Sequence, residues 1–214
     1  MLDVENVIQA INKALEPFFI KGEGGFFSLF QHKSSNVFRL KITEGCSDAY
    51  DDYGNNSGDS VKVVKWFSDY WLFIEIKFPH PKGVLITLSV FQGEEADSWK
   101  NQLFRAEWDD YEDESMNHPQ PHWHVLSNKA IENTVSSFAE IASDDIKDTF
   151  EKVLNEEKSK TINLSKFHFA MNGDWNNTSI HIHPVNNEKK LVNWFGGLLA
   201  YLKTELKYID SKRS

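Results

Sequence analysis

The sequence predicts an α+β protein built on a mainly antiparallel sheet of about seven to nine strands. Two observations lead to this fold class. Segments with apolar residues at every second position follow one another through links of hairpin length. Helical periodicity is confined to the two ends of the chain and to one insertion, which is not the alternation of strand and helix that a parallel sheet requires. The 214 residues fit a single domain.

Four segments have the period of a helix, at residues 3–16, 128–142, 145–157 and 187–209. Asp3 is a suitable N-cap for the first of them, and Pro17 ends it. The fourth carries a wide apolar stripe. We expect this stripe to pack in the core, with a homodimer interface as the alternative.

Five segments before the middle of the chain predict strands, at residues 26–31, 37–43, 61–67, 70–78 and 84–91. The last of them is apolar on both faces, which is typical of a central strand. Residues 44–60 are rich in Asp, Asn, Gly and Ser, and they predict a flexible polar surface loop, with an ion site as the alternative.

The next segment, residues 103–126, predicts a β-hairpin with an acidic tip. Arg105, Glu107 and Asp109 alternate with apolar residues along its first strand. His122 and His124 alternate with apolar residues along its second strand. If the apolar sets share a face, the five polar side chains share the other face. The acidic tip at residues 109–114 predicts a solvated loop, and metal binding or docking of a basic partner are its alternatives.

A second hairpin is predicted downstream, from residue 167 to residue 183. His168 lies on its first strand, and His181 and His183 lie on its second. If both hairpins belong to one sheet, its polar face gathers up to five imidazoles beside the arginine and the carboxylates of the first hairpin. Six of the eight histidines lie between residues 118 and 183.

Three interpretations of the histidines stay open. They could be structural, because pairs of the type His-x-His also occur on solvated strand faces. They could perform metal-free acid–base or nucleophilic chemistry, because imidazole titrates near neutral pH. They could hold a divalent metal such as zinc, together with one carboxylate. The imidazoles that would then bind the metal are His122, His124, His181 and His183; otherwise we expect no cofactor.

Composition bounds the location and the partners. The formal net charge is −9 and the isoelectric point is about 5.4, which disfavours nucleic-acid binding over a broad surface. The single cysteine, Cys46, allows no internal disulfide and suits a reducing compartment. The chain shows neither a signal peptide nor a membrane-spanning apolar run. We expect a cytoplasmic protein of prokaryotic type.

Residues 118–124, H-P-Q-P-H-W-H, resemble the active strand of the histidine-triad nucleotide hydrolases and transferases, whose pattern is His-x-His-x-His. Gln120 stands where that family has its first histidine, and the Gly-Ser lead-in of the transferase branch is absent. The resemblance implies that His122 attacks phosphorus and that His124 helps to orient the phosphate.

The wider pattern R-x-E-W-D…H-P-x-P-H-x-H is similar to hairpins in small proteins of prokaryotic toxin–antitoxin or phage-defence loci, some of them suspected ribonucleases. Arg105, Asp109, His122 and His124 are the matching positions. This resemblance implies a role in defence.

Two functions therefore follow as expectations. The first is a histidine-dependent phosphodiesterase, acting as a nuclease on RNA or as a nucleotide hydrolase. Its expected catalytic residues are Arg105, Glu107, Asp109, His122, His124 and His168, with His181 and His183 completing the pocket. The second is a non-catalytic antitoxin, immunity or accessory protein, which binds a basic partner encoded nearby through its acidic surface.

Overall fold

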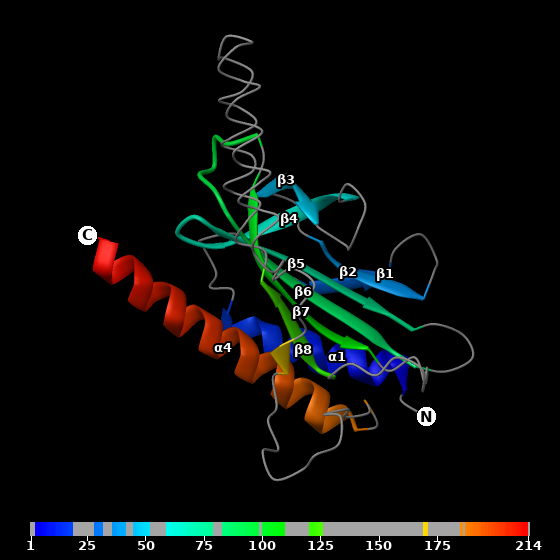
Figure 1. Cartoon of the computed structure of the whole chain (residues 1–214). Coiled ribbons are helices and arrows are strands. Elements are labelled where there is room, and N and C mark those ends of the chain that lie inside the picture. The colour runs from blue at the N-terminus through cyan, green and yellow to red at the C-terminus, as the bar shows by residue number, and fades with distance from the viewer. Residues whose placement is uncertain are drawn as a thin grey trace, which may run out of the picture.

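The predicted α+β class and the mainly antiparallel sheet are confirmed. A computed structural model describes residues 3–18, 28–31, 36–41, 45–51, 59–78, 83–98, 100–109, 120–125, 169–170, 185 and 187–213. Within these residues, one sheet of nine strands carries a helix from each end of the chain against it (Figure 1).

All named strand pairs are antiparallel, and most of them join strands that are neighbours in the sequence. The order along the sheet is β1-β2-β5-β6-β7-β8-β9, while β4 pairs with β5 and β3 pairs with β4. The strands are β1 (Ser28–Gln31), β2 (Val37–Lys41), β3 (Cys46–Asp51), β4 (Asp59–Phe67), β5 (Tyr70–Lys77), β6 (Leu85–Gln92), β7 (Asn101–Asp109), β8 (His122–Val125) and β9 (Phe169–Ala170).

The helices α1 (Val4–Leu15) and α4 (Glu188–Arg213) confirm the two terminal predictions, the second with four more residues at its end. Asp3 caps α1 as expected, because its Oδ1 accepts a hydrogen bond of 3.2 Å from the backbone N–H of Asn6. A short 3-10 helix, η1 (Glu16–Phe18), follows α1. The helices predicted at 128–142 and 145–157 lie outside the described residues. No helix in the described part is long and apolar enough to cross a membrane.

One face of the sheet forms the main core. Alternate residues of β5 and β6 are fully buried there, among them Leu72, Ile74, Ile86 and Leu88. Both helices cover this face, α1 with its Val7–Leu15 stripe and α4 with the residues predicted to form its apolar stripe (Figure 1). The stripe of α4 is therefore core, as predicted, and dimerisation through α4 stays a prediction.

The other face carries a smaller apolar cluster and most of the buried polar side chains. The prediction of a loop at 44–60 is wrong here, because Cys46–Asp51 form β3. All six residues of β3 pair with β4. Ala49 is fully buried in a second cluster with Val63, Trp71, Phe73 and Phe91. Pairing and burial thus override the low strand propensity of a segment rich in Asp and Ser.

Candidate functional site

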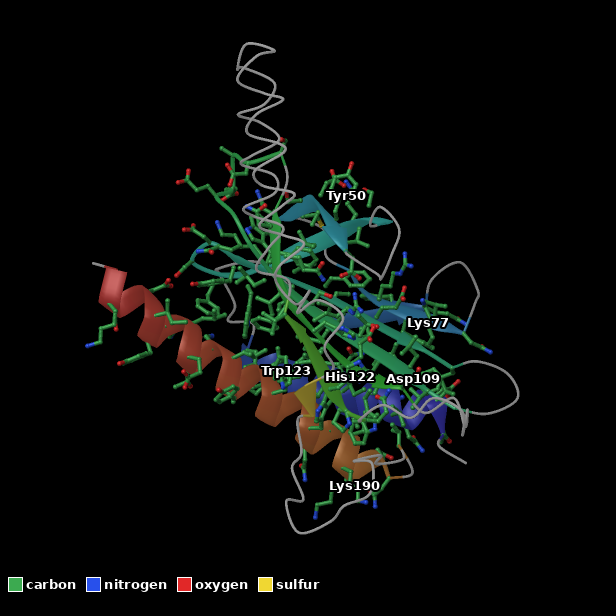
Figure 2. The ribbon with its side chains drawn as sticks, in the orientation of Figure 1. Tyr50, Lys77, Asp109, His122, Trp123 and Lys190 are labelled. Carbon is green, nitrogen blue, oxygen red and sulfur yellow. The ribbon has the colours of Figure 1, made fainter. Side chains whose placement is uncertain are left out.

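The hairpin strands β7 and β8 place the candidate residues on one face. The antiparallel register sets Arg105 opposite His124 and Glu107 opposite His122, while Ala106 lies opposite Trp123. The shared face predicted from alternation is therefore the one that the register gives. Trp123 packs against the main core, which α4 covers, and His122 is its neighbour on β8, so its side chain faces the other side of the sheet. Both residues are labelled in Figure 2.

Four of these side chains meet. Nε2 of His122 lies 2.8 Å from Nε2 of His124, and Oε2 of Glu107 lies 3.0 Å from the Nε2 of His124 and 3.4 Å from that of His122. The Nε of Arg105 lies 3.0 Å from the other carboxylate oxygen, Oε1 of Glu107. All four are buried, with 1% of His122 and 8% of Glu107 exposed to solvent.

Glu107 is held in its ionised form. Burial by itself would raise the pKa of Glu107, but hydrogen bonds from His122 and His124 and the positive charge of Arg105 together keep that pKa well below its usual range. A buried carboxylate that stays charged fixes the positions of the imidazoles beside it. Imidazoles oriented in this way suit proton transfer.

The cluster belongs to a polar row that crosses five neighbouring strands in register. Arg39 on β2 pairs with Glu75 on β5, Glu75 with Thr87 on β6, Thr87 with Glu107 on β7, and Glu107 with His122 on β8. At the end of this row on β2 and β5, Glu75 forms a separate set of ion pairs, with Arg39 and with Lys77. The carboxylates of Glu75 and Glu107 therefore contact different basic side chains.

Asp109 is the last residue of β7, and Gln120 comes shortly before β8 begins. The backbone N–H of Asp109 donates a hydrogen bond of 2.8 Å to Oε1 of Gln120. Gln120, which occupies the first position of the histidine-triad pattern, thus ties β8 to the backbone of β7. Within the described part of the chain, the ligand-type atoms that gather within 4.8 Å belong to Glu107, His122 and His124, and Asp109 is not one of them. The predicted site residues His168, His181 and His183 lie outside the described residues.

A second buried polar group borders the site and was not predicted. Oδ1 of Asp51 accepts a hydrogen bond of 2.9 Å from the Ser89 hydroxyl and another from the Gln102 amide. Burial raises the pKa of Asp51, although the charge of Arg105 and both donors oppose the rise. Ser89 is the cross-strand neighbour of Arg105, so this group continues the polar face along β6 and β7. Alternation could have indicated Ser89, whereas Asp51 lay in the segment predicted as a loop.

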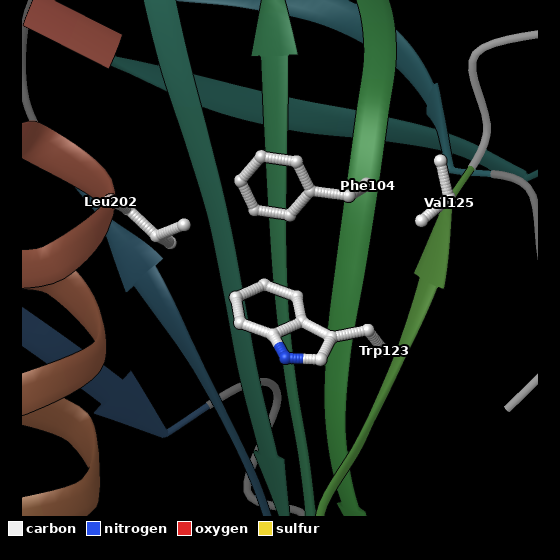
Figure 3. Close-up of a pocket in the computed structure, with 4 residues that line it drawn as sticks. All are labelled: Phe104, Trp123, Val125 and Leu202. Carbon is white, nitrogen blue, oxygen red and sulfur yellow. The ribbon is translucent and has the colours of Figure 1, made fainter. Parts of the chain in front are cut away.

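The opposite face of the same hairpin carries an apolar pocket. Phe104, Trp123 and Val125 line it from β7 and β8, and Leu202 lines it from α4 (Figure 3). Its volume is about 260 Å³. Side chains alternate between the two faces of β8, so His122 and His124 lie on one face and Trp123 on the other. The hairpin therefore carries the polar cluster on one face and the apolar pocket on the opposite face.

The contacts among Glu107, His122 and His124 allow two kinds of chemistry: proton transfer between imidazoles oriented by a carboxylate, and binding of a cation by the same atoms. No family model, curated protein or solved structure matches this chain.

Proposed function

We propose that the protein is a histidine-dependent phosphodiesterase that hydrolyses a nucleotide or a related phosphate ester at the Glu107–His122–His124 cluster. The observation that supports it is one ionised, buried carboxylate in contact with two imidazoles and a guanidinium. Imidazoles supply an acid and a base at neutral pH, and hydrolysis of a phosphate ester needs both.

The reaction is an attack of water on phosphorus. A bond forms between the water oxygen and phosphorus, and the ester P–O bond breaks. One imidazole takes the proton of the water, and the other gives a proton to the leaving alkoxide. The two Nε2 atoms lie 2.8 Å apart, so the proton gained by one ring can return to the other after each turnover.

Glu107 and Arg105 have supporting roles in this proposal. The Glu107 carboxylate stabilises the imidazolium that forms, as an oriented carboxylate does in hydrolytic triads. Arg105 holds the second oxygen of that carboxylate and adds positive charge where the phosphate binds. Asp109, His168, His181 and His183 remain predicted contributors to the pocket.

The burial of the cluster favours a small substrate. Because His122 is 1% exposed and His124 is 6% exposed, a nucleotide suits the site better than a folded RNA. A setting in prokaryotic defence is supported by the resemblance of the hairpin to proteins of toxin–antitoxin and phage-defence loci.

The test is turnover by the purified chain. Bis(4-nitrophenyl) phosphate and a panel of linear and cyclic nucleotides would be incubated with the protein, with and without added divalent metal. We expect hydrolysis, and a fall in kcat of about 10²- to 10⁴-fold in His122→Gln and in His124→Gln. Glutamine is used because alanine would leave a cavity at these buried positions.

The matched control is Glu75→Gln, which changes a buried carboxylate on the same sheet face, two strands away from Glu107. Its kcat should equal that of the wild type. Absence of turnover by the wild type under every condition, or full turnover by both histidine variants, would contradict the proposal.

A second candidate is favoured by one observation, the net charge of −9. In this case the protein is an antitoxin, immunity or accessory protein that binds a basic protein partner. Pull-down of neighbouring gene products at low and moderate salt would test it. Binding that does not weaken as ionic strength rises would count against an electrostatic interface.

A further inference from the structure

The contacts among Nε2 of His122, Nε2 of His124 and Oε2 of Glu107 cannot all be hydrogen bonds. Each Nε2 carries at most one proton, and the carboxylate oxygen of an ionised Glu107 carries none. If one imidazole donates to the other, the accepting Nε2 has no proton to offer Glu107. If both Nε2 atoms are protonated and point to Glu107, two N–H groups face each other at 2.8 Å.

Every arrangement of protons therefore leaves one unfavourable contact in this triangle. A cation above its centre removes the conflict, because all three atoms can then offer a lone pair to it. Both imidazoles would carry their ring proton on Nδ1, which is the usual state of a histidine that binds metal through Nε2. The three atoms are thus arranged as ligands around an ion.

The distances fit one ion. Ligands held about 2.1 Å from a metal lie about 3.0 Å apart at right angles and about 3.4 Å apart at the tetrahedral angle. The three separations here are 2.8, 3.0 and 3.4 Å. A triangle with these sides has a circumradius of about 1.8 Å, so a point about 1.1 Å above its plane lies about 2.1 Å from all three atoms.

We propose that Glu107, His122 and His124 bind one divalent first-row transition-metal ion through Oε2 and the two Nε2 atoms. Two imidazoles and one carboxylate select such an ion over magnesium or calcium, which prefer oxygen ligands alone. The three ligands occupy one side of the ion, and this pattern occurs in catalytic zinc sites and in non-haem iron sites that keep open positions.

Arg105 is the positioning residue of this site. Its Nε lies 3.0 Å from Oε1 of Glu107, which leaves Oε2 to the imidazoles and makes the carboxylate a single-oxygen ligand. Arg105 also balances the carboxylate charge, so a bound ion gives the centre a net charge of +2. With the ion bound, neither Nε2 can exchange a proton. On the proposed function, a water held by the ion would then be the attacking group, because this charge would attract the phosphate of the substrate and lower the pKa of that water.

The experiment is calorimetric titration of Zn²⁺ into the full chain, produced without a polyhistidine tag and stripped with a chelator. We expect one site per chain in the wild type, and affinity at least about 100-fold lower in His122→Gln and in His124→Gln. Arg105→Met should lose about 10-fold, and Glu75→Gln, the matched buried carboxylate, should bind as the wild type does.

Wild-type protein that binds no Zn²⁺ would overturn the inference whether or not the variants fold. Unchanged affinity in both folded histidine variants would do the same. The two proposals fail separately. Zinc binding without phosphate-ester hydrolysis would refute the proposed function alone, and hydrolysis by chelator-stripped protein that takes up no Zn²⁺ in the titration would refute the metal site alone.

Discussion

Arg105 and Glu107, two residues apart on β7, form a buried ion pair in which Nε lies 3.0 Å from Oε1. Their side chains leave the same face of the strand, and each lies opposite a histidine of β8. The pair therefore fixes which carboxylate oxygen meets the imidazoles. Any change at Glu107 acts on the arginine and on both histidines at once.

Glu107→Gln is expected to lower the free energy of unfolding by about 3 kcal/mol, because it leaves the buried Arg105 charge without its carboxylate. Urea denaturation of both proteins at neutral pH measures this loss. The control is Glu95→Gln, which breaks an exposed ion pair with Lys65 and should change the stability little. Equal effects of the two substitutions would show that the Arg105–Glu107 pair is not buried as described.

The raised pKa of Asp51 predicts that the stability of the protein depends on pH. The pKa of Asp51 is raised in the folded protein, so the folded state holds the proton more tightly than the unfolded state does. The contribution of Asp51 to stability is therefore largest at low pH, and it is lost as pH rises from the ordinary value of 3.8 through the folded-state pKa.

The variant Asp51→Asn keeps an oxygen that can accept from Ser89 and Gln102 but cannot ionise. Its stability relative to the wild type should rise with pH across this window and then level off. Urea unfolding at closely spaced pH values measures the difference. A difference that stays constant with pH would contradict the raised pKa.

The burial of Phe195 predicts a large contribution of α4 to the free energy of unfolding. The Phe195 side chain is fully buried in the main core, so Phe195→Ala should lower the free energy of unfolding by about 3–5 kcal/mol. Tyr201 lies on the same helix and is 57% exposed, and Tyr201→Ala should change stability by less than about 0.5 kcal/mol. Thermal and urea unfolding compare the two variants, and equal losses would mean that α4 packs with another face.

A hydrogen bond between Asn12 and Leu29 joins α1 to β1, and it predicts a loss of stability when Asn12 is replaced. Oδ1 of Asn12 accepts this hydrogen bond of 2.7 Å from the backbone N–H of Leu29, a partly buried donor. Asn12→Ala leaves that donor unsatisfied and should cost about 1–3 kcal/mol of stability. Lys13→Ala, at the exposed neighbouring position, is the control in the same denaturation experiment. The assignment fails if the two alanine variants are equally stable.

Alternation along strands was sufficient to predict much of the fold. The period of two placed Arg105 and Glu107 on one face and Ala106 on the other, since each side chain in a paired strand must choose between core and polar face. Apolar residues on both faces of the segment likewise indicated that β6 is central. Both terminal helices followed from the spacing of their apolar residues.

The features that the sequence did not predict depend on contacts between segments that are distant in the chain. β3 has no apolar alternation, and only its pairing with β4 and the burial of Ala49 make it a strand. The same holds for the site, because alternation gives a face but no distances. That both Nε2 atoms meet one oxygen of Glu107 depends on side-chain torsions. The contributions of His168, His181 and His183 stay predictions.

The most direct test of the centre is a long-range ¹H–¹⁵N NMR correlation of the histidine rings, recorded before and after one equivalent of Zn²⁺. We expect Nε2 of His122 and of His124 both to move to the chemical shift of a metal-bound nitrogen, while each Nδ1 becomes the protonated ring nitrogen. Ring spectra of these two residues that do not change, or zinc shifts confined to other histidines, would contradict it.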